Sequence, residues 1–373
     1  MLKRICGPSH NSVVETLNNL AGVYSNKGDF DKALPLYTEC LEALSSTETA
    51  ADMQIKVDTL TNVALLYNKQ GKYDLSLKRY TDCLELNRNL HGNIHVASAD
   101  VLCCMAGIHE KQKEYTEALQ LYAESLEMKR KIYGDEHASI ADTLNDTAVV
   151  LTHQSNFEEA LSLYEFSLEM KRDVYKADHS SIVDTLNNMA YVYYIGGNYA
   201  ESLRLYGERL AMMKRLFGEE HPSVAVSVSN IAILFDKQGK YAEALAMYKE
   251  SLEHKRRLQR HVRESGDSED PAALEGAIAD TLSDIANMHE KLGHYPRALD
   301  VYQESLQLKQ RVYSGDHPSI ADTLGDLANV FEKLGKYDDS LTFHRKALAM
   351  KRAVYGVQQA SIADSLTNIS MSH

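Results

Sequence analysis

The sequence predicts an all-α protein, a right-handed α-solenoid (superhelix) of antiparallel helix–turn–helix units. One observation is a recurring pentapeptide, IADTL at 140–144, 278–282 and 320–324, with IADSL at 362–366. Another is its period: the final residue has counterparts 42 residues apart, except for one step of 43 and one of 54. These anchor residues are Leu17, Leu60, Leu102, Leu144, Leu186, Val228, Leu282, Leu324 and Leu366. Each unit is expected to pack mainly on its neighbours.

Apolar residues spaced three and four apart, the pattern of one helix face, predict the first helix of each repeat. In the repeat at 320–356 they are Leu324, Leu327, Ala328 and Phe331. Proline precedes some first helices, as at Pro318, and suits a first turn because the N–H that it lacks has no helical partner there. Four residues after the anchor, a small residue lets helix backbones approach closely: Ala21, Ala64, Ala106, Ala148, Ala190, Ala232, Ala286 and Ala328.

A tight turn and a second helix complete the repeat. Gly335 interrupts the first pattern, and glycine suits the left-handed conformation in which many helices end. Tyr337 then opens a second helical pattern that includes Leu341 and Leu348. Leucine stands at these last two places in every complete repeat. They predict an apolar seam, in which each fully buried leucine contributes roughly 1.5 to 3 kcal/mol.

These features resemble the tetratricopeptide repeat, which has a small residue in the first helix, a turn, an aromatic residue after it and A/S-L-x-x-Y in the second helix. The aromatic residues are Phe30, Tyr73, Tyr115, Phe157, Tyr199, Tyr241, Tyr295 and Tyr337. The 42-residue length and the phrases SLEMKRKIYGDEHASIADTL and LFGEEHPSV are similar to the subtype of kinesin light chains and nephrocystin-3-like proteins. The resemblance covers about residues 8 to 373 and implies a scaffold for protein–protein interaction.

The anchors also predict the organisation of the chain. Repeats 1 to 6 occupy 8–258, and repeats 7 and 8 occupy 277–356. Between them, 259–276 is predicted as an inserted charged loop, because basic and acidic residues surround glycine, serine and proline there. We also expect the basic helix that leads into this insertion to be lengthened. Residues 357–373 are predicted as a terminal half-repeat or capping helix.

Composition narrows the class of partner. The chain has 40 lysines and arginines against 53 aspartates and glutamates, a net charge of -13, so as a whole it has no positive field for nucleic acid or an anionic membrane. No stretch approaches the roughly 20 apolar residues that span a bilayer. Five cysteines without a disulfide-scaffold spacing are typical of a reducing compartment. We expect a cytoplasmic protein that binds neither nucleic acid nor membrane.

No motif for catalysis or cofactor binding stands out: GxxxxGK[ST], GxGxxG, HExxH and GxSxG are missing. We therefore expect no enzyme activity and no cofactor. Histidine recurs seven residues before the anchor, at His10, His95, His137, His179, His221 and His317. One histidine per repeat cannot converge on a metal ion when helices pack roughly 10 Å apart, so we expect loop and helix-capping roles and no metal site.

A stripe of each first helix remains free when the anchor face packs. It contains the residues two before, and two, five and nine after, the anchor, which share one helix face. Its first two rows are largely acids and asparagines, and the acids include Asp142, Asp146 and Asp184. These acids could contribute to a binding surface. The alternative is that they only interact with the helix dipole and keep the surface soluble. In the resembling family, the asparagine of LNNLA bonds the backbone of an extended peptide, which nominates Asn19, Asn62, Asn188 and Asn230.

Repeats 4 to 6 make the stripe apolar and aromatic. The residues are Val149, Tyr191, Tyr194, Ile195, Val226 and Ile233. An exposed patch of this kind usually marks a partner site. With the acids around it, the patch predicts a groove for a protein or peptide with a hydrophobic anchor and basic flanks. The alternative is that these residues only improve packing between repeats.

Three functions remain open. The leading one is a non-catalytic protein–protein interaction scaffold that binds a peptide or protein segment in its concave groove. The second is a regulatory or sensor arm of a larger signalling NTPase or kinase. The third is a kinesin light chain-like motor-cargo adaptor, for which a heptad coiled coil would be expected and is not found in this sequence.

Overall fold

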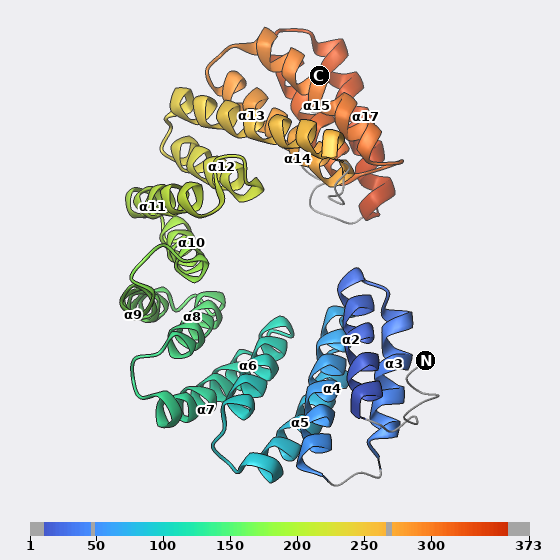
Figure 1. Ribbon diagram of the computed structural model, residues 1–373. Coiled ribbons are helices and arrows are strands. Elements are labelled where there is room, and N and C mark those ends of the chain that lie inside the picture. Colours follow the sequence, from blue (N-terminus) through green and yellow to red (C-terminus); the bar gives the residue numbers. More distant parts are fainter. Residues whose placement is uncertain (1–10, 46–48, 266–270, 357–373) are drawn as a thin grey trace. The chain divides into compact units, whose positions relative to one another are not determined.

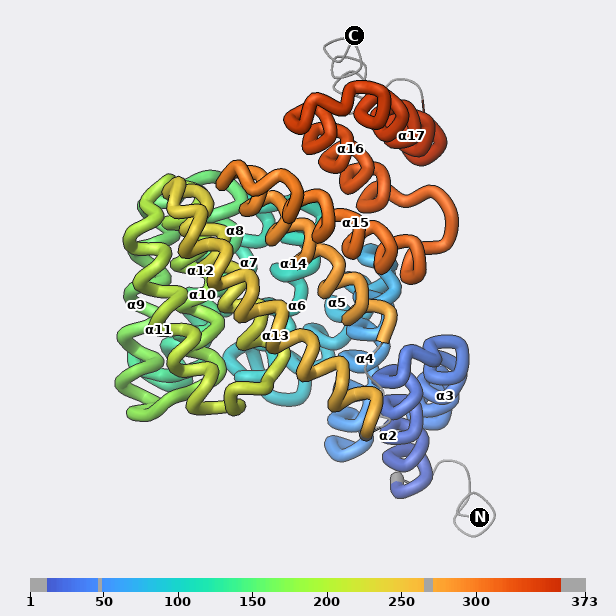
Figure 2. Tube along the Cα trace, turned by 90° about the horizontal axis from the view of Figure 1, so that it is seen from above, coloured from blue at the N-terminus to red at the C-terminus, as the bar shows by residue number. Residues whose placement is uncertain are grey.

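The computed structural model describes residues 11–45, 49–265 and 271–356, where α-helix is the only regular secondary structure (Figure 1). The helices are α2 (Asn11–Lys27), α3 (Phe30–Ala43), α4 (Ala50–Lys69), α5 (Tyr73–His91), α6 (Val96–Lys111), α7 (Tyr115–Tyr133), α8 (Ala138–His153), α9 (Phe157–Tyr175), α10 (Ser180–Ile195), α11 (Tyr199–Phe217), α12 (Pro222–Lys237), α13 (Tyr241–Ser265), α14 (Pro271–Lys291), α15 (Tyr295–Val312), α16 (Pro318–Lys333) and α17 (Tyr337–Tyr355). The two helices of a repeat lie side by side (Figure 2). The predicted all-α solenoid of helix–turn–helix repeats is confirmed.

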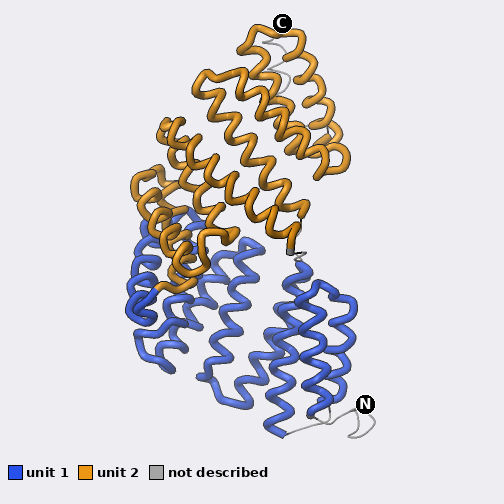
Figure 3. The backbone as a smooth tube through the Cα atoms, turned by 45° about the horizontal axis from the view of Figure 1, so that its top comes forward, with its two compact units in different colours: residues 1–177 blue, residues 178–373 orange. Residues whose placement is uncertain are grey.

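The chain divides into two compact units, Met1–Ala177 and Asp178–His373 (Figure 3). Compact unit 1 contains α2 to α9, and compact unit 2 contains α10 to α17. Within each unit, the second helix of one repeat also packs on the first helix of the next. The apolar core therefore runs along each stack of helices, as expected for a repeat protein.

A buried serine ties the two helices of many repeats together. Ser125 Oγ donates to the carbonyl oxygen of Ala99 at 2.8 Å, and Ser305 Oγ donates to that of Ala279 at 2.7 Å. Each acceptor is the alanine three residues before the anchor, the A of IADTL in repeat 7. In repeat 1, Cys40 takes the place of the serine, and its Sγ lies 3.4 Å from the carbonyl oxygen of Val14. This position requires a small side chain because the helices are close.

The turn inside each repeat ends the first helix in a left-handed conformation. Gly335 has φ 72°, as the sequence predicts. At the same place in repeats 3 and 4, Lys113 and Ser155 have φ 63° and 64°. The turn is therefore kept even where the residue is not glycine, because the tertiary packing of the helix pair holds the conformation.

The repeated histidine caps the first helix. His137 and His317 accept hydrogen bonds at Nδ1 from the backbone N–H two residues later, at 3.1 and 3.2 Å. His95, His179 and His221 do the same. The imidazole of His317 also stacks on the ring of Tyr313 at the end of α15, with 3.7 Å between ring centroids. The predicted helix-capping role is confirmed for these five histidines.

The lengthened helix expected in this insertion is confirmed, whereas the bounds 259–276 predicted for the loop are wrong. Helix α13 continues to Ser265 and α14 begins at Pro271, so helix replaces loop at both ends of the interval. Val262 is buried, and Glu275 Oε1 accepts from Gln259 Nε2 at 3.2 Å and from Arg263 Nη2 at 2.9 Å. These contacts give the extra turns a packing partner that charge composition does not show. The intervening 266–270, like the predicted capping segment 357–373, lies outside the described residues.

None of the described helices combines the length and the apolar character needed to cross a membrane. In the same residues, no group of three or more histidine, cysteine, aspartate or glutamate side chains is placed to hold a metal ion.

Replacing the capping histidine tests its contribution. His317→Ala should destabilise the start of α16 by about 0.5 to 2 kcal/mol, because it removes the acceptor for the Ser319 N–H. Amide hydrogen exchange should show faster exchange at Ser319. His261→Ala, at an exposed position on α13, serves as the control. Unchanged protection of Ser319 would show that the imidazole does not stabilise this helix end.

Candidate functional site

The candidate residues belong to first helices of both compact units. On compact unit 1 they are Asn19 on α2, Asn62 on α4, and Asp142, Asp146 and Val149 on α8. On compact unit 2 they are Asp184, Asn188, Tyr191, Tyr194 and Ile195 on α10, and Asn230 and Ile233 on α12. The residues of the predicted stripe therefore belong to two surfaces, one on each compact unit.

Compact unit 2 brings four candidate residues together around one pocket of about 190 Å³. Its walls are Tyr191, Tyr194, Tyr206, Asn230, Ile233 and Leu234. The rings of Tyr191 and Tyr194 lie 6.5 Å apart, measured between centroids. Asn230 contributes an amide to a wall that is otherwise aromatic and aliphatic. We call this site the tyrosine pocket. It suits an apolar side chain accompanied by one polar contact.

Apolar side chains at and beside the tyrosine pocket are exposed to solvent. The exposed fraction is 49% for Tyr191, 38% for Ile195, 50% for Val226 and 36% for Ile233. A purely packing role would bury such side chains, so their exposure favours a partner surface over the packing interpretation.

The acids of the stripe have cationic partners that the sequence analysis missed. Four aspartates form ion pairs with lysines of second helices: Asp100 with Lys129 at 3.2 Å, Asp142 with Lys171 at 2.9 Å, Asp280 with Lys309 at 3.0 Å, and Asp322 with Lys351 at 3.0 Å. The lysine side chains are 2% to 16% exposed, whereas the aspartates are 51% to 65% exposed. Each lysine stands 27 residues after its anchor. The recurrence of a charged residue at this buried position of the second helix was the sequence feature that could have predicted the ion pairs.

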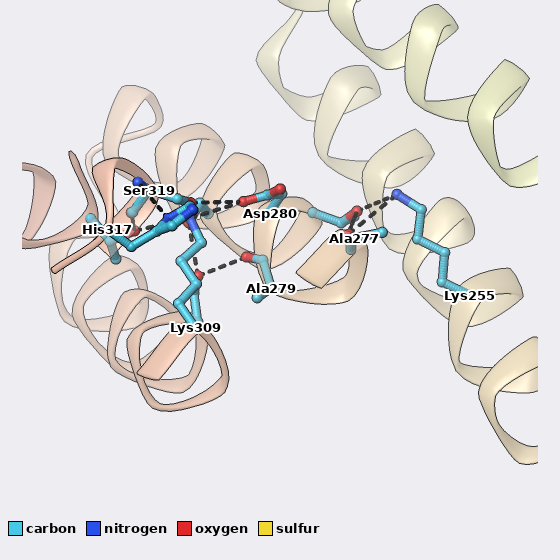
Figure 4. A network of polar contacts seen from close by, with 11 residues as sticks. Lys255, Ala277, Ala279, Asp280, Lys309, His317 and Ser319 are labelled. Atoms are coloured by element: carbon cyan, nitrogen blue, oxygen red, sulfur yellow. Dashed lines mark hydrogen bonds and ion pairs between the residues drawn. The ribbon is translucent and has the colours of Figure 1, made fainter. Parts of the chain in front are cut away.

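Lys309 shows what this ammonium group does (Figure 4). Besides pairing with Asp280, its Nζ donates to Ser283 Oγ at 3.1 Å and to Thr323 Oγ1 at 3.0 Å. Thr323 belongs to the following repeat, and Ser319 of that repeat donates to Asp280 at 3.2 Å. We call this arrangement of lysine, aspartate of the same repeat and threonine of the next repeat the clasp. It joins one repeat to the next.

Other repeats contain the clasp whole or in part. Lys129 pairs with Asp100, lies 3.5 Å from Cys103 Sγ and donates to Thr143 Oγ1 at 3.0 Å. In repeat 6, Lys255 Nζ donates to Thr281 Oγ1 at 2.6 Å and to the carbonyl oxygen of Ala277 at 3.5 Å (Figure 4). The aspartate of that repeat is replaced by Val226. In IADTL, the aspartate thus belongs to the clasp of its own repeat, and the threonine belongs to the clasp of the preceding repeat.

Repeat 5 departs from this pattern next to the tyrosine pocket. Met213 stands where the clasp lysine would be, and Arg209, one turn earlier on α11, donates from Nη1 to Ser227 Oγ of the next repeat. Burial lowers the pKa of Arg209, and the charges of Tyr206 and Asp184 partly oppose this shift. Asp184 therefore lacks the clasp lysine of its own repeat, and Arg209, on which its charge acts, donates to Ser227.

Asp146, on α8 of compact unit 1, holds its proton more strongly than an ordinary aspartate. Burial, together with the nearby Asp142 and Glu110 carboxylates, raises the pKa of Asp146 to about 6, against the lowering effects of a hydrogen bond from Asn145 and the charge of Lys171. The causes that raise it outweigh those that lower it. This carboxyl is less available to attract a basic ligand than the sequence suggests.

The candidate asparagines differ in their surroundings. Asn19 is exposed on α2, whereas Asn62 is half-buried and its Nδ2 donates to Asn18 Oδ1 at 3.3 Å. Asn188 is half-buried, and Asn230 lines the tyrosine pocket. Binding to a peptide backbone stays a prediction for all four.

The stacked helix pairs define a helical-repeat scaffold. Sequence comparison gives the family: models of the tetratricopeptide repeat match residues 95–173, 181–257 and 277–353, and related models of the same repeat match 16–51 and 57–97. The chain belongs to the tetratricopeptide repeat family, as the resemblance of its sequence indicated. No curated protein matches it by sequence.

Solved structures share the fold. A Signal Transduction ATPase with Numerous Domains protein with a tetratricopeptide repeat sensor, from Pyrococcus horikoshii, is 14% identical with TM-score 0.66, over 97% of this chain and 50% of that one. The quorum sensor NprR from B. thuringiensis is 15% identical with TM-score 0.60, over 91% and 87%. BtubC (BKLC) from P. vanneervenii is 19% identical with TM-score 0.53, over 66% and 94%.

A double-mutant cycle measures the clasp. Asp280→Asn should lower the free energy of unfolding by about 1 to 2 kcal/mol, because the buried Lys309 ammonium loses its direct ion pair and keeps only the charges of Asp284 and Asp326 nearby. The half-exposed carboxylate of Asp280 keeps the loss below the about 3 to 5 kcal/mol of a fully buried pair. Adding Lys309→Met, the residue of repeat 5, should recover most of the loss in urea unfolding. Additive effects of the two changes would mean that the charges do not interact.

The raised pKa of Asp146 predicts a pH dependence. The folded protein holds this proton up to about pH 6, whereas an ordinary aspartate loses it near 3.8. The group therefore favours the folded state below 3.8, and this contribution is lost as pH rises through about 6. The stability of Asp146→Asn relative to wild type should therefore increase when the pH is raised from about 4 to about 7. Thermal unfolding at both values, with exposed Asp74→Asn as control, measures it; parallel profiles for Asp146→Asn and wild type would contradict it.

Proposed function

We propose that this chain is a non-catalytic scaffold that binds a segment of another protein. In compact unit 2, the tyrosine pocket takes one apolar side chain of that segment. We assign the hydrogen bonds to its backbone to Asn188 and Asn230, on the first helices of successive repeats, as the tetratricopeptide resemblance implies. The observation that carries the proposal is the exposure of Tyr191, Val226 and Ile233 beside a concave pocket.

The charge of the segment is a finer part of the proposal. Clasp lysines compensate the acids of repeats 3, 4, 7 and 8, so these acids select only weakly for basic residues. Asp184 is exposed on α10, the helix that also carries Tyr191 and Tyr194, and the lysine of its own clasp is replaced by Met213. We therefore place the basic flank of the segment next to Asp184, with the hydrophobic anchor as the main source of affinity.

A sensor arm of a larger protein is the second candidate. It is supported by the likeness in fold to the Pyrococcus horikoshii protein, which spans 97% of this chain. The two functions differ in their response to a ligand. A scaffold binds its segment with local protection around the tyrosine pocket, whereas a sensor arm changes hydrogen exchange in repeats far from the ligand.

Tyrosine variants test the pocket. Tyr191→Ala with Tyr194→Ala should lose bound proteins in an affinity pull-down from lysate, read by mass spectrometry, because both rings form the pocket wall. Tyr337→Ala with Tyr355→Ala, two tyrosines of α17 that are 56% and 38% exposed, is the matched control. Each partner lost should then bind purified wild type about tenfold or more tightly than the pocket variant. Equal binding by folded wild-type and pocket-variant protein would remove the tyrosine pocket from the site.

A further inference from the structure

A larger pocket lies on compact unit 1, between the first helices of repeats 2 and 3. Its volume is about 390 Å³, and its walls come from α4, α5 and α6. It is separate from the tyrosine pocket and shares no residue with it. The residues that matter for its chemistry are Asp58, Thr61, Asn87 and Val101.

Asn87 stands at the clasp position of repeat 2. It lies 27 residues after the anchor Leu60, where Lys129 and Lys309 follow their own anchors. An asparagine side chain ends well short of the lysine ammonium position. Repeat 2 nevertheless keeps the aspartate of the clasp, Asp58.

The pocket coincides with the place that the lysine ammonium takes in complete clasps. In repeats 3 and 7, Nζ meets three side chains: the aspartate two before the anchor, the residue after the anchor, and the threonine just before the next anchor. The counterparts in repeat 2 are Asp58, Thr61 and Val101, and all three line the pocket.

Hydrogen-bond acceptors converge there, and of the two carboxylates that line the pocket, Asp100 has an ion-pair partner, Lys129 at 3.2 Å, whereas Asp58 has none among the described residues. Asn87 is fully buried, and its Oδ1 has no hydrogen-bond partner among the described residues, although its Nδ2 lies 3.7 Å from Cys83 Sγ. Asp58 accepts from Gln54 Nε2 at 3.0 Å, and no basic side chain of the described ranges pairs with it. A buried, unpartnered amide oxygen is uncommon in folded proteins and needs an explanation.

We propose that this pocket binds the ammonium group of a lysine side chain from a bound protein segment. An ammonium has three donors, which match the Asp58 carboxylate, the Thr61 hydroxyl and the Asn87 amide oxygen. The alkyl stem of the lysine packs on the apolar walls at Val57 and Val101. The ligand thereby completes the clasp of repeat 2 from outside the chain. This site is independent of the tyrosine pocket, so either can fail alone.

The first test uses the full chain with selectively ¹⁵N-labelled asparagine and n-butylammonium, the lysine side chain without its backbone. Butylammonium should shift the side-chain amide signal of Asn87, whereas tetramethylammonium at equal ionic strength should not, because it has no N–H donors. The signal is assigned by its loss in Asn87→Leu. Equal shifts with both ions, or none with either, would overturn the proposal.

Variants then test the residues through the neighbouring Asn62 amide signal, since Asn62 also lines the pocket. Asp58→Asn should weaken butylammonium binding about fivefold or more, whereas Asp74→Asn, which removes an equal charge from α5, should not. Asn87→Lys supplies the internal ammonium and should abolish binding. Asn87→Leu, which resembles repeat 1 with its Leu44, should do the same without added charge. Binding that persists in either folded Asn87 variant would contradict the proposal.

The source of the ammonium group is tested last. The peptide acetyl-Ala-Ala-Lys-Ala-Ala-amide should shift the same signals, and its norleucine counterpart should not. Spermidine carries the same chemistry as a free amine. If spermidine binds about tenfold more tightly than the lysine peptide, the pocket belongs to a small polyamine and the assignment to a protein segment is wrong.

Discussion

A lysine ammonium buried between neighbouring repeats organises the polar part of this structure. Helix pairs can pack on each other through leucine and alanine in many registers, but Lys309 reaches both Asp280 and Thr323 only when successive repeats are correctly placed. Buried ion pairs add little net stability, because desolvation offsets much of the Coulomb attraction. Such pairs contribute mainly to the specificity of packing, since a misplaced repeat would leave a buried charge without a partner.

The sequence predicted the architecture well because the period and the apolar spacing recur along the chain and most repeats have glycine in the turn. It predicted the histidine caps for a physical reason, the impossibility of one metal ion being reached from successive repeats. The lysines escaped notice because a lysine beside arginine in phrases such as EMKR is typical of an exposed helix end. A lengthened helix in the insertion was expected, but how far α13 extends and where α14 begins were missed because Val262 and the Glu275 hydrogen bonds are tertiary contacts. Composition alone cannot show them.

The candidate surface was foreseeable in its apolar part and not in its charges. Tyr191 and Ile233 stand out in the sequence because most other repeats have glycine or asparagine there, and they line a pocket in the structure. The acids were counted as free charges, yet four of them serve the joints between or within repeats. The same helix face thus contains both structural carboxylates and binding side chains, and only contacts across repeats distinguish them.

The direction of the clasp bears on how such a chain can change during evolution. Each complete clasp draws a lysine and an aspartate from one repeat and a threonine from the next, so duplicating or deleting a whole 42-residue cassette leaves the remaining junctions complete. Length can then vary without redesign of the interior. The 54-residue step shows how added sequence is tolerated: the bond between Lys255 and Thr281 is retained at 2.6 Å while α13 and α14 grow beyond it. Insertions are thereby directed to the outer ends of helix pairs, where new recognition elements can arise without disturbing the joints.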